Sequence, residues 1–189
     1  MTEHNSNKNV QLDDRNKQMD DRKRQMRIAS LIQTMIIYDH GDPMRIHHFL
    51  KVLEFSRTIG ILECVSEDTQ YILETAAVVH EIGIHVCEDR YGNSNGKLQE
   101  QEGPAIAKTM LAELGYEDEV IERVCYLVGH HHTYTDIDGM DYQILVEADF
   151  LVNLYEDDVT DEGKSQALQR IFKTKTGYEM LRQIYDISE

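Results

Sequence analysis

Apolar residues recur at helical spacing along most of this chain. Met26, Ala29, Ile32 and Ile36 follow one another at intervals of three or four positions. The same period continues through the segments 42–60, 66–83, 103–115, 117–132, 140–157 and, in two shorter pieces, 161–185. Residues at this spacing share one face of an α-helix, and no sustained strand-like alternation interrupts them. The pattern predicts an all-α fold, a single bundle of roughly seven to eight helices.

Polar residues mark where the predicted helices begin and end. Asp42–Pro43 is a typical helix entry, and Ser66 followed by Thr69–Gln70 resembles a capping box. Gly, Asn and Ser gather in residues 90–103, which predicts a surface loop. If this loop is flexible, residues 89–100 could close over a substrate. Residues 1–16 are polar and predict a disordered tail, so that residues 17–189 form one helical domain.

Composition narrows the classes of partner. The chain has 189 residues and a formal net charge of −16, which repels phosphate backbones and disfavours general nucleic-acid binding. A small phosphorylated substrate remains compatible, because a bound divalent cation reverses the local field. Three cysteines without metal-like spacing indicate buried thiols in a reducing compartment. No apolar leader or membrane-spanning run occurs, so we expect a cytoplasmic protein with no membrane partner.

In each of four predicted helices, a histidine or a carboxylate, side chains that commonly bind metals, lies on the apolar face or at the helix end. These residues are His48, His80 with Glu81 beside it, His131 and Asp149. Any one of these could be a core residue bonded to the backbone. Burying all of them is costly unless they share a partner, and imidazole and carboxylate together are the ligand set of Zn, Mn and Fe sites. His47 lies on a polar face and is expected at the surface, and His130 falls outside the apolar stripe that contains His131.

Three short stretches carry a family resemblance. His48 in "HFLKV", His80–Glu81 in "VVHEIG" and Asp149 in "LVEADFLVN" resemble, in order, the histidine, the His–Asp pair and the closing aspartate of the HD superfamily of metal-dependent phosphohydrolases. The resemblance covers residues 28–156, with glutamate in place of the aspartate of the pair. It implies an HD-like helical bundle that binds a divalent metal (Mn, Zn, Ni or Fe) through His48, His80, Glu81 and Asp149.

The resemblance also implies an activity. A metal-activated water would hydrolyse a phosphomonoester or phosphodiester, plausibly in a nucleotide, with Glu81, Asp149 and His131 as catalytic residues. One ion is expected, and binuclear relatives suggest Glu102, His131 and His132 as ligands of a second. The basic residues that could contact a substrate phosphate are Arg45, Lys51, Arg90 and Lys97.

Two other functions fit the same residues. A catalytically degenerate HD domain could bind a nucleotide or a partner without turnover, since Glu81 is one methylene longer than the usual aspartate. A di-iron oxygenase of HD type could use Glu102 and His131 for its second iron. Metal content and turnover separate the three alternatives. The sequence is compatible with either a monomer or a homodimer.

Overall fold

The computed structural model describes the backbone of residues 3–187 and the side chains of residues 17–187. The helices in this part of the chain are α1 (Glu3–Tyr38), α2 (Pro43–Leu62), α3 (Glu67–Val79), α4 (Ile84–Tyr91), α5 (Gly96–Glu113), α6 (Asp118–Val128), α7 (Met140–Glu156), α8 (Asp161–Arg170) and α9 (Lys175–Ile184). No strand occurs between residues 3 and 187. The predicted all-α fold is therefore confirmed, with nine helices in the described residues against the roughly seven to eight expected.

The predicted tail of residues 1–16 falls outside the residues with described side chains. Its boundary with a domain at residue 17 stays a prediction. Within residues 3–187, no helix combines the length and the apolarity needed to cross a membrane.

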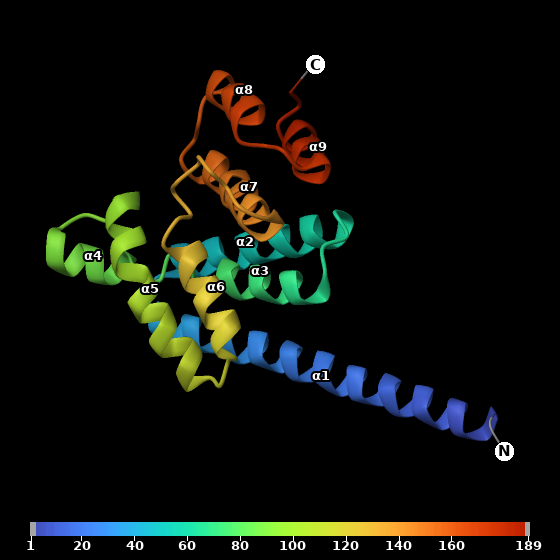
Figure 1. Ribbon diagram of the computed structural model, residues 1–189. Coiled ribbons are helices and arrows are strands. Elements are labelled where there is room, and N and C mark those ends of the chain that lie inside the picture. The colour runs from blue at the N-terminus through green and yellow to red at the C-terminus, as the bar shows by residue number, and fades with distance from the viewer. Residues whose placement is uncertain (1–2, 188–189) are drawn as a thin grey trace.

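The helix α3 lies at the centre of the bundle. It packs against α1, α2, α6 and α7, while α2 also packs along α7, and α5 along α6 (Figure 1). Its apolar residues Leu73, Ala76 and Ala77 are completely buried. The two alanines allow neighbouring helices to approach closely, so that the end of α3 is placed deep in the bundle.

Helix caps form where the sequence predicts them. The side chain of Asp42 accepts a hydrogen bond from the Arg45 N–H, with Pro43 at the first helical position. Ser66 accepts one from the Thr69 N–H. Both caps satisfy amide groups that have no partner inside their helix. The starts of α2 and α3, and hence the positions of their inward-facing residues, are thus determined locally.

The predicted long loop over residues 90–103 is wrong. The helix α4 runs to Tyr91 and α5 begins at Gly96, so only four residues connect them. Gly92 ends α4 in the left-handed conformation (φ 69°), and the Asn95 side chain caps α5 by accepting from the Leu98 N–H. Gly and Asn serve here as cap residues, which share their composition with loops. Residues 89–100 are therefore mostly helical and do not form the long loop that was expected to close over a substrate.

The connection between α3 and α4 is a tight turn that contains Glu81. The helix α3 ends at Val79 with His80 as its C-cap, and α4 starts at Ile84. A Cβ on Gly83 would lie 3.0 Å from the Gly103 nitrogen and 3.1 Å from the Gln99 carbonyl oxygen, which are backbone atoms of α5. The absence of a side chain at Gly83 thus allows the turn to rest directly on α5.

We expect Gly83→Ala to lower the free energy of unfolding by about 1–3 kcal/mol, since neither backbone can move away without disturbing a helix. Urea unfolding followed by circular dichroism measures the change. The matched control is Ser30→Ala on the exposed face of α1, which should alter stability by no more than about 0.5 kcal/mol. Equal stability of Gly83→Ala and the wild type would contradict the tight contact.

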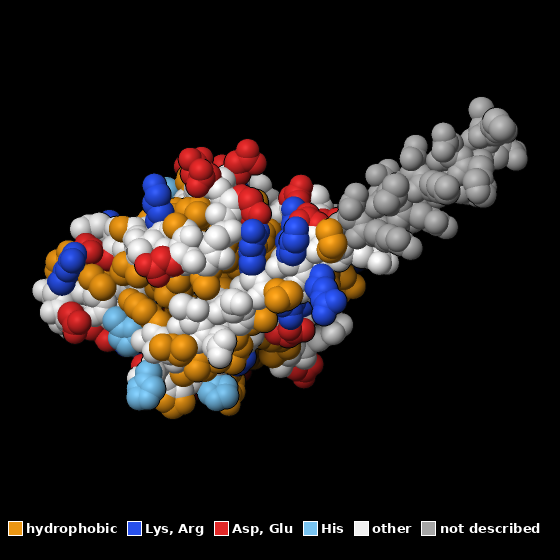
Figure 2. All heavy atoms as spheres, turned by 90° about the horizontal axis from the view of Figure 1, so that it is seen from below, with side chains coloured by type: hydrophobic (Ala, Val, Ile, Leu, Met, Phe, Trp, Pro, Cys, Tyr) orange, Lys and Arg blue, Asp and Glu red, His pale blue; other side chains and the backbone are white. Residues whose placement is uncertain are grey.

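The face of the molecule that includes α1 carries charges of both signs interspersed with groups of apolar side chains (Figure 2). Met26 and Ile37 of α1 and Ile61 of α2 are more than half exposed. Exposed apolar residues are common on protein surfaces and do not by themselves indicate a binding site.

Candidate metal centre

Side chains from α2, the α3–α4 turn and α7 meet at one point in the bundle. The Nε2 atoms of His48 and His80 lie 3.2 Å apart. The Asp149 Oδ1 atom is 3.3 Å from His48 Nε2 and 3.4 Å from His80 Nε2. Glu81 contributes Oε2 at 3.5 Å from His48 Nε2. The structure thus brings together all four residues that the sequence suggested as ligands.

Each imidazole is oriented by a hydrogen bond at its other nitrogen. His80 Nδ1 lies 3.0 Å from the Ala77 carbonyl oxygen, and His48 Nδ1 lies 2.7 Å from Glu156 Oε2. Both acceptors lack a proton, so each Nδ1 must be the donor. The two Nε2 atoms therefore remain to face each other and the two carboxylates.

Burial and charge act in opposite directions on the groups of this cluster. Burial works to lower the pKa of His48, but the hydrogen bond to Asp149 and the charges of Glu81 and Asp149 outweigh it and raise the pKa to about 9. Burial works to raise the pKa of Asp149, and hydrogen bonds from His48 and His80 instead hold it well below its ordinary range. The cluster favours bound positive charge at its centre.

The donor set fits a divalent metal ion. One ligand atom each from His48, His80 and Glu81 lie within 4.8 Å of one another, and Asp149 Oδ1 adjoins both imidazoles. Two imidazole nitrogens and two carboxylates are suitable ligands for Mn, Fe, Zn or Ni. Although Glu81 is longer than the aspartate expected at this position, its carboxylate reaches the histidines, because its backbone lies in the turn after α3.

The triplet of histidines after α6 divides between two environments. His131 is completely buried; its Nδ1 donates to the Val128 carbonyl oxygen at 2.8 Å, and its ring centroid lies 5.4 Å from that of His80. His132 lies beside it, with ring centroids 4.1 Å apart and ring planes tilted by 42°. His130 instead donates to the Tyr126 carbonyl oxygen and stacks on the Tyr126 ring. Hence His131 and His132 approach the cluster.

His131 is held in its neutral form. Burial, followed by the proximity of the His132 and His80 rings, lowers its pKa well below the ordinary value. The Nε2 atoms of His131 and His132 are buried without a hydrogen-bond partner among the described residues. A neutral imidazole with an unshared Nε2 lone pair can accept a proton or coordinate a metal.

Glu102 does not join the cluster. Its carboxylate accepts hydrogen bonds from Arg90 Nη1 at 2.6 Å and from the Tyr91 hydroxyl at 2.9 Å. These contacts connect α5 to the end of α4. The position of Glu102 on the helix therefore directs it to α4, and the expectation that it serves a second metal is not supported by the geometry.

Three of the four basic phosphate candidates are held by carboxylates. Arg45 binds Glu88 at 2.6 Å, Arg90 binds Glu102, and Lys51 binds Glu156. Lys97 is exposed, and no ion pair or hydrogen bond of its side chain is found within the described part of the chain. It stands in the first turn of α5 beside Gly96, where an added Cβ would lie 2.6 Å from the His132 ring. Lys97 is therefore the candidate most available to a ligand.

Two polar residues around the cluster have no counterpart among the sequence predictions. Asn153 Nδ2 donates to Asp149 Oδ1 at 2.9 Å, and Glu156 Oε2 accepts from His48 Nδ1. Both follow Asp149 on α7, at four and seven positions, and thus lie on the same face of that helix. This spacing is a signal in the sequence that could have identified them.

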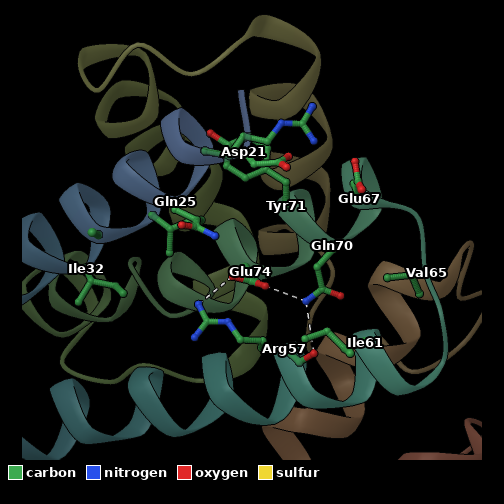
Figure 3. Close-up of a pocket in the computed structure, with 13 residues that line it drawn as sticks. Asp21, Gln25, Ile32, Arg57, Ile61, Val65, Glu67, Gln70, Tyr71 and Glu74 are labelled. Carbon is green, nitrogen blue, oxygen red and sulfur yellow. Dashed lines mark hydrogen bonds and ion pairs between the residues drawn. The ribbon is translucent and has the colours of Figure 1, made fainter. Parts of the chain in front are cut away.

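The cavity beside α1 is separate from this centre. It has a volume of about 580 Å³ and lies between α1 and the α2–α3 connection, with Ile32, Ile61 and Val65 among its lining residues (Figure 3). Its polar groups bind one another: Arg57 donates to Glu74, as does Gln70. None of the metal-ligand candidates lines it.

The sequence matches no family model and no curated protein. The fold is similar to the crystal structure of a predicted HD superfamily hydrolase from an uncultured Thermotogales bacterium. The two chains are 22% identical, the likeness covers 84% of this chain and 83% of the other, and the TM-score is 0.58. At this identity the comparison establishes a shared fold. The predicted resemblance to the HD superfamily is thus confirmed at the level of the fold.

Proposed function

We propose that this protein is a metal-dependent phosphohydrolase that cleaves a phosphomonoester or phosphodiester, with nucleotides as the first substrate class to test. The observation that carries the proposal is the convergence of His48, His80, Glu81 and Asp149 from three separate segments of the chain. Such a buried set of donors is costly to assemble unless it binds a cation. The HD-like fold supports the same assignment by analogy alone.

His48, His80, Glu81 and Asp149 would hold one divalent ion. When bound, such an ion lowers the pKa of a water molecule and polarises a phosphoryl oxygen. The Glu81 side chain is 22% exposed, against 5% or less for His48, His80 and Asp149. Glu81 therefore forms the solvent-facing side of the centre, and a substrate would approach from that side.

The residues around the centre have distinct roles in this proposal. His131 Nε2 is unprotonated and can accept a hydrogen bond from the water that attacks phosphorus. Asn153 keeps the Asp149 carboxylate oriented. Lys97 is exposed in the first turn of α5 and has no ion pair among the described residues, so it is the most available of the basic residues to contact a substrate phosphate. Arg45, Lys51 and Arg90 would first have to leave their ion pairs.

No specific observation favours the other two functions. The di-iron alternative used Glu102, which binds Arg90 and Tyr91 instead. The degenerate alternative rested on the length of Glu81, and its carboxylate reaches His48. A second ion remains compatible with the unpartnered Nε2 atoms of His131 and His132.

Metal content and turnover test the proposal directly. Tag-free protein, purified without chelator, is analysed for metals and then assayed against a panel of phosphomonoesters, phosphodiesters and nucleotides. We expect about one divalent ion per chain, and hydrolysis that a chelator abolishes and added Mn²⁺ restores. Protein that retains no metal after incubation with Mn²⁺, or that binds metal but hydrolyses none of the panel, would count against a phosphohydrolase.

A further inference from the structure

Glu156 connects the candidate metal centre to a surface lysine. It is the last residue of α7, and its Oε2 atom lies 2.7 Å from His48 Nδ1. Its other carboxylate oxygen, Oε1, accepts a hydrogen bond from Lys51 Nζ on α2. The Glu156 side chain is 20% exposed and that of Lys51 is 42% exposed. The carboxylate is thus partly desolvated and contacts a positive charge on one side and an imidazole on the other.

The contact determines which nitrogen of His48 faces the centre. A carboxylate accepts hydrogen bonds and donates none, so His48 Nδ1 carries the proton. The His48 Nε2 atom is then the nitrogen that lies 3.3 Å from Asp149 and 3.5 Å from Glu81. A rotated ring would give up both the bond to Glu156 and the approach to the two carboxylates.

His48 differs from the other two inward-facing histidines in the nature of its partner. The Nδ1 atoms of His80 and His131 donate to backbone carbonyl groups of their own chain segments. His48 donates to an ionisable side chain 108 positions away. A negatively charged acceptor makes an imidazole a stronger electron donor at its opposite nitrogen than a neutral carbonyl does.

We propose that Glu156 is a positioning residue for the metal centre: it holds His48 with Nε2 toward the ion and strengthens that ligand, while Lys51 holds the carboxylate in place. This inference rests on the metal site of the proposed function. Partners of this kind, when removed, typically reduce metal affinity or activity about 10- to 100-fold.

A purely structural role makes a different prediction. Glu156 and Lys51 also form an ion pair between α7 and α2, which are neighbours in the bundle. If that pair were the whole function, removal of either residue would lower thermal stability similarly and leave metal affinity unchanged. Lys51→Met separates the two roles, because it removes the ion pair and leaves the bond between Glu156 and His48.

The test measures Mn²⁺ affinity of the full-length, metal-free protein by calorimetric titration, together with the melting temperature in chelator. We expect Glu156→Ala to weaken Mn²⁺ binding about 10- to 100-fold. Glu156→Gln keeps an acceptor oxygen without its charge and should fall between Glu156→Ala and the wild type. We expect Lys51→Met to weaken binding much less than Glu156→Ala. The matched control is Glu54→Gln, whose exposed carboxylate binds Arg57, and it should bind Mn²⁺ like the wild type.

The outcomes separate this inference from the proposed function. If the wild type binds Mn²⁺ and Glu156→Ala binds it equally well, the inference is overturned and the hydrolase proposal stands. Similar losses of melting temperature in Lys51→Met and Glu156→Ala, with Mn²⁺ affinity unchanged in both, would show a purely structural ion pair and would also overturn the inference. If Glu156→Ala binds more weakly as expected but the wild type hydrolyses no phosphate ester, the inference holds and the proposed activity fails. If the wild type binds no metal, both are wrong.

Discussion

Replacing Asp149 with asparagine is expected to abolish metal retention and to lower phosphate-ester turnover by at least about 1,000-fold, or about 4 kcal/mol of transition-state stabilisation. Asn has nearly the same shape as Asp, and its carbonyl oxygen can still accept the hydrogen bond that Asn153 makes to Oδ1. What it lacks is the negative charge beside His48 Nε2 and His80 Nε2. Without that charge, a divalent ion loses one of its two anionic ligands.

The measurement combines elemental analysis, turnover and melting in chelator for the wild type and Asp149→Asn. Because no packing volume is lost, we expect the metal-free variant to stay folded and to unfold within about 2 kcal/mol of the metal-free wild type. The matched control is Asp138→Asn, an exposed aspartate that binds Arg123 away from the cluster. Wild-type turnover in Asp149→Asn would disprove the assignment of this carboxylate.

The second large effect concerns stability rather than chemistry. Glu147 of α7 is completely buried, and its carboxylate accepts hydrogen bonds from the backbone amides of Lys173 and Thr174, from the Thr174 hydroxyl and from the Gln143 amide. Burial raises the pKa of Glu147, and these four donors counteract it. The Glu147 carboxylate thereby provides the acceptor for the hydrogen-bond donors of the segment that precedes α9, and it attaches this segment to α7.

We expect Glu147→Ala to lower the free energy of unfolding by about 2–4 kcal/mol, because several buried donors lose their acceptor at once. Glu147→Gln retains one acceptor oxygen and should cost less. Urea unfolding measures both, and hydrogen exchange at the Lys173 and Thr174 amides reports where protection is lost. The control is Glu162→Ala on the exposed face of α8, expected within about 0.5 kcal/mol of the wild type. A Glu147→Ala variant as stable as this control would show that water replaces the carboxylate without cost.

The helical fold and the inward direction of the principal ligands could be predicted from local pattern. His48 shares a helix face with Val52 and Ile59, and all three are buried. A helix requires only the spacing of its own residues and a cap such as Ser66, so these features follow from neighbours in sequence. The same reasoning failed for residues 96–103, which were predicted as loop but form the start of α5, because Gly and Asn occur both in loops and at helix ends.

Which side chains contact the candidate metal ligands depended on how distant segments of the chain pack together. Glu102 of α5 and Glu156 of α7 are both glutamates, yet Glu102 binds Arg90 on α4 and Glu156 binds His48 on α2. Helical periodicity determines the face on which a side chain lies, to within a fraction of a turn. It does not determine which helix packs on that face. That is decided by how whole helices fit around α3. The sequence alone therefore determined the helices and their inward-facing His and Asp residues, and the tertiary structure decided which side chains from different helices come into contact.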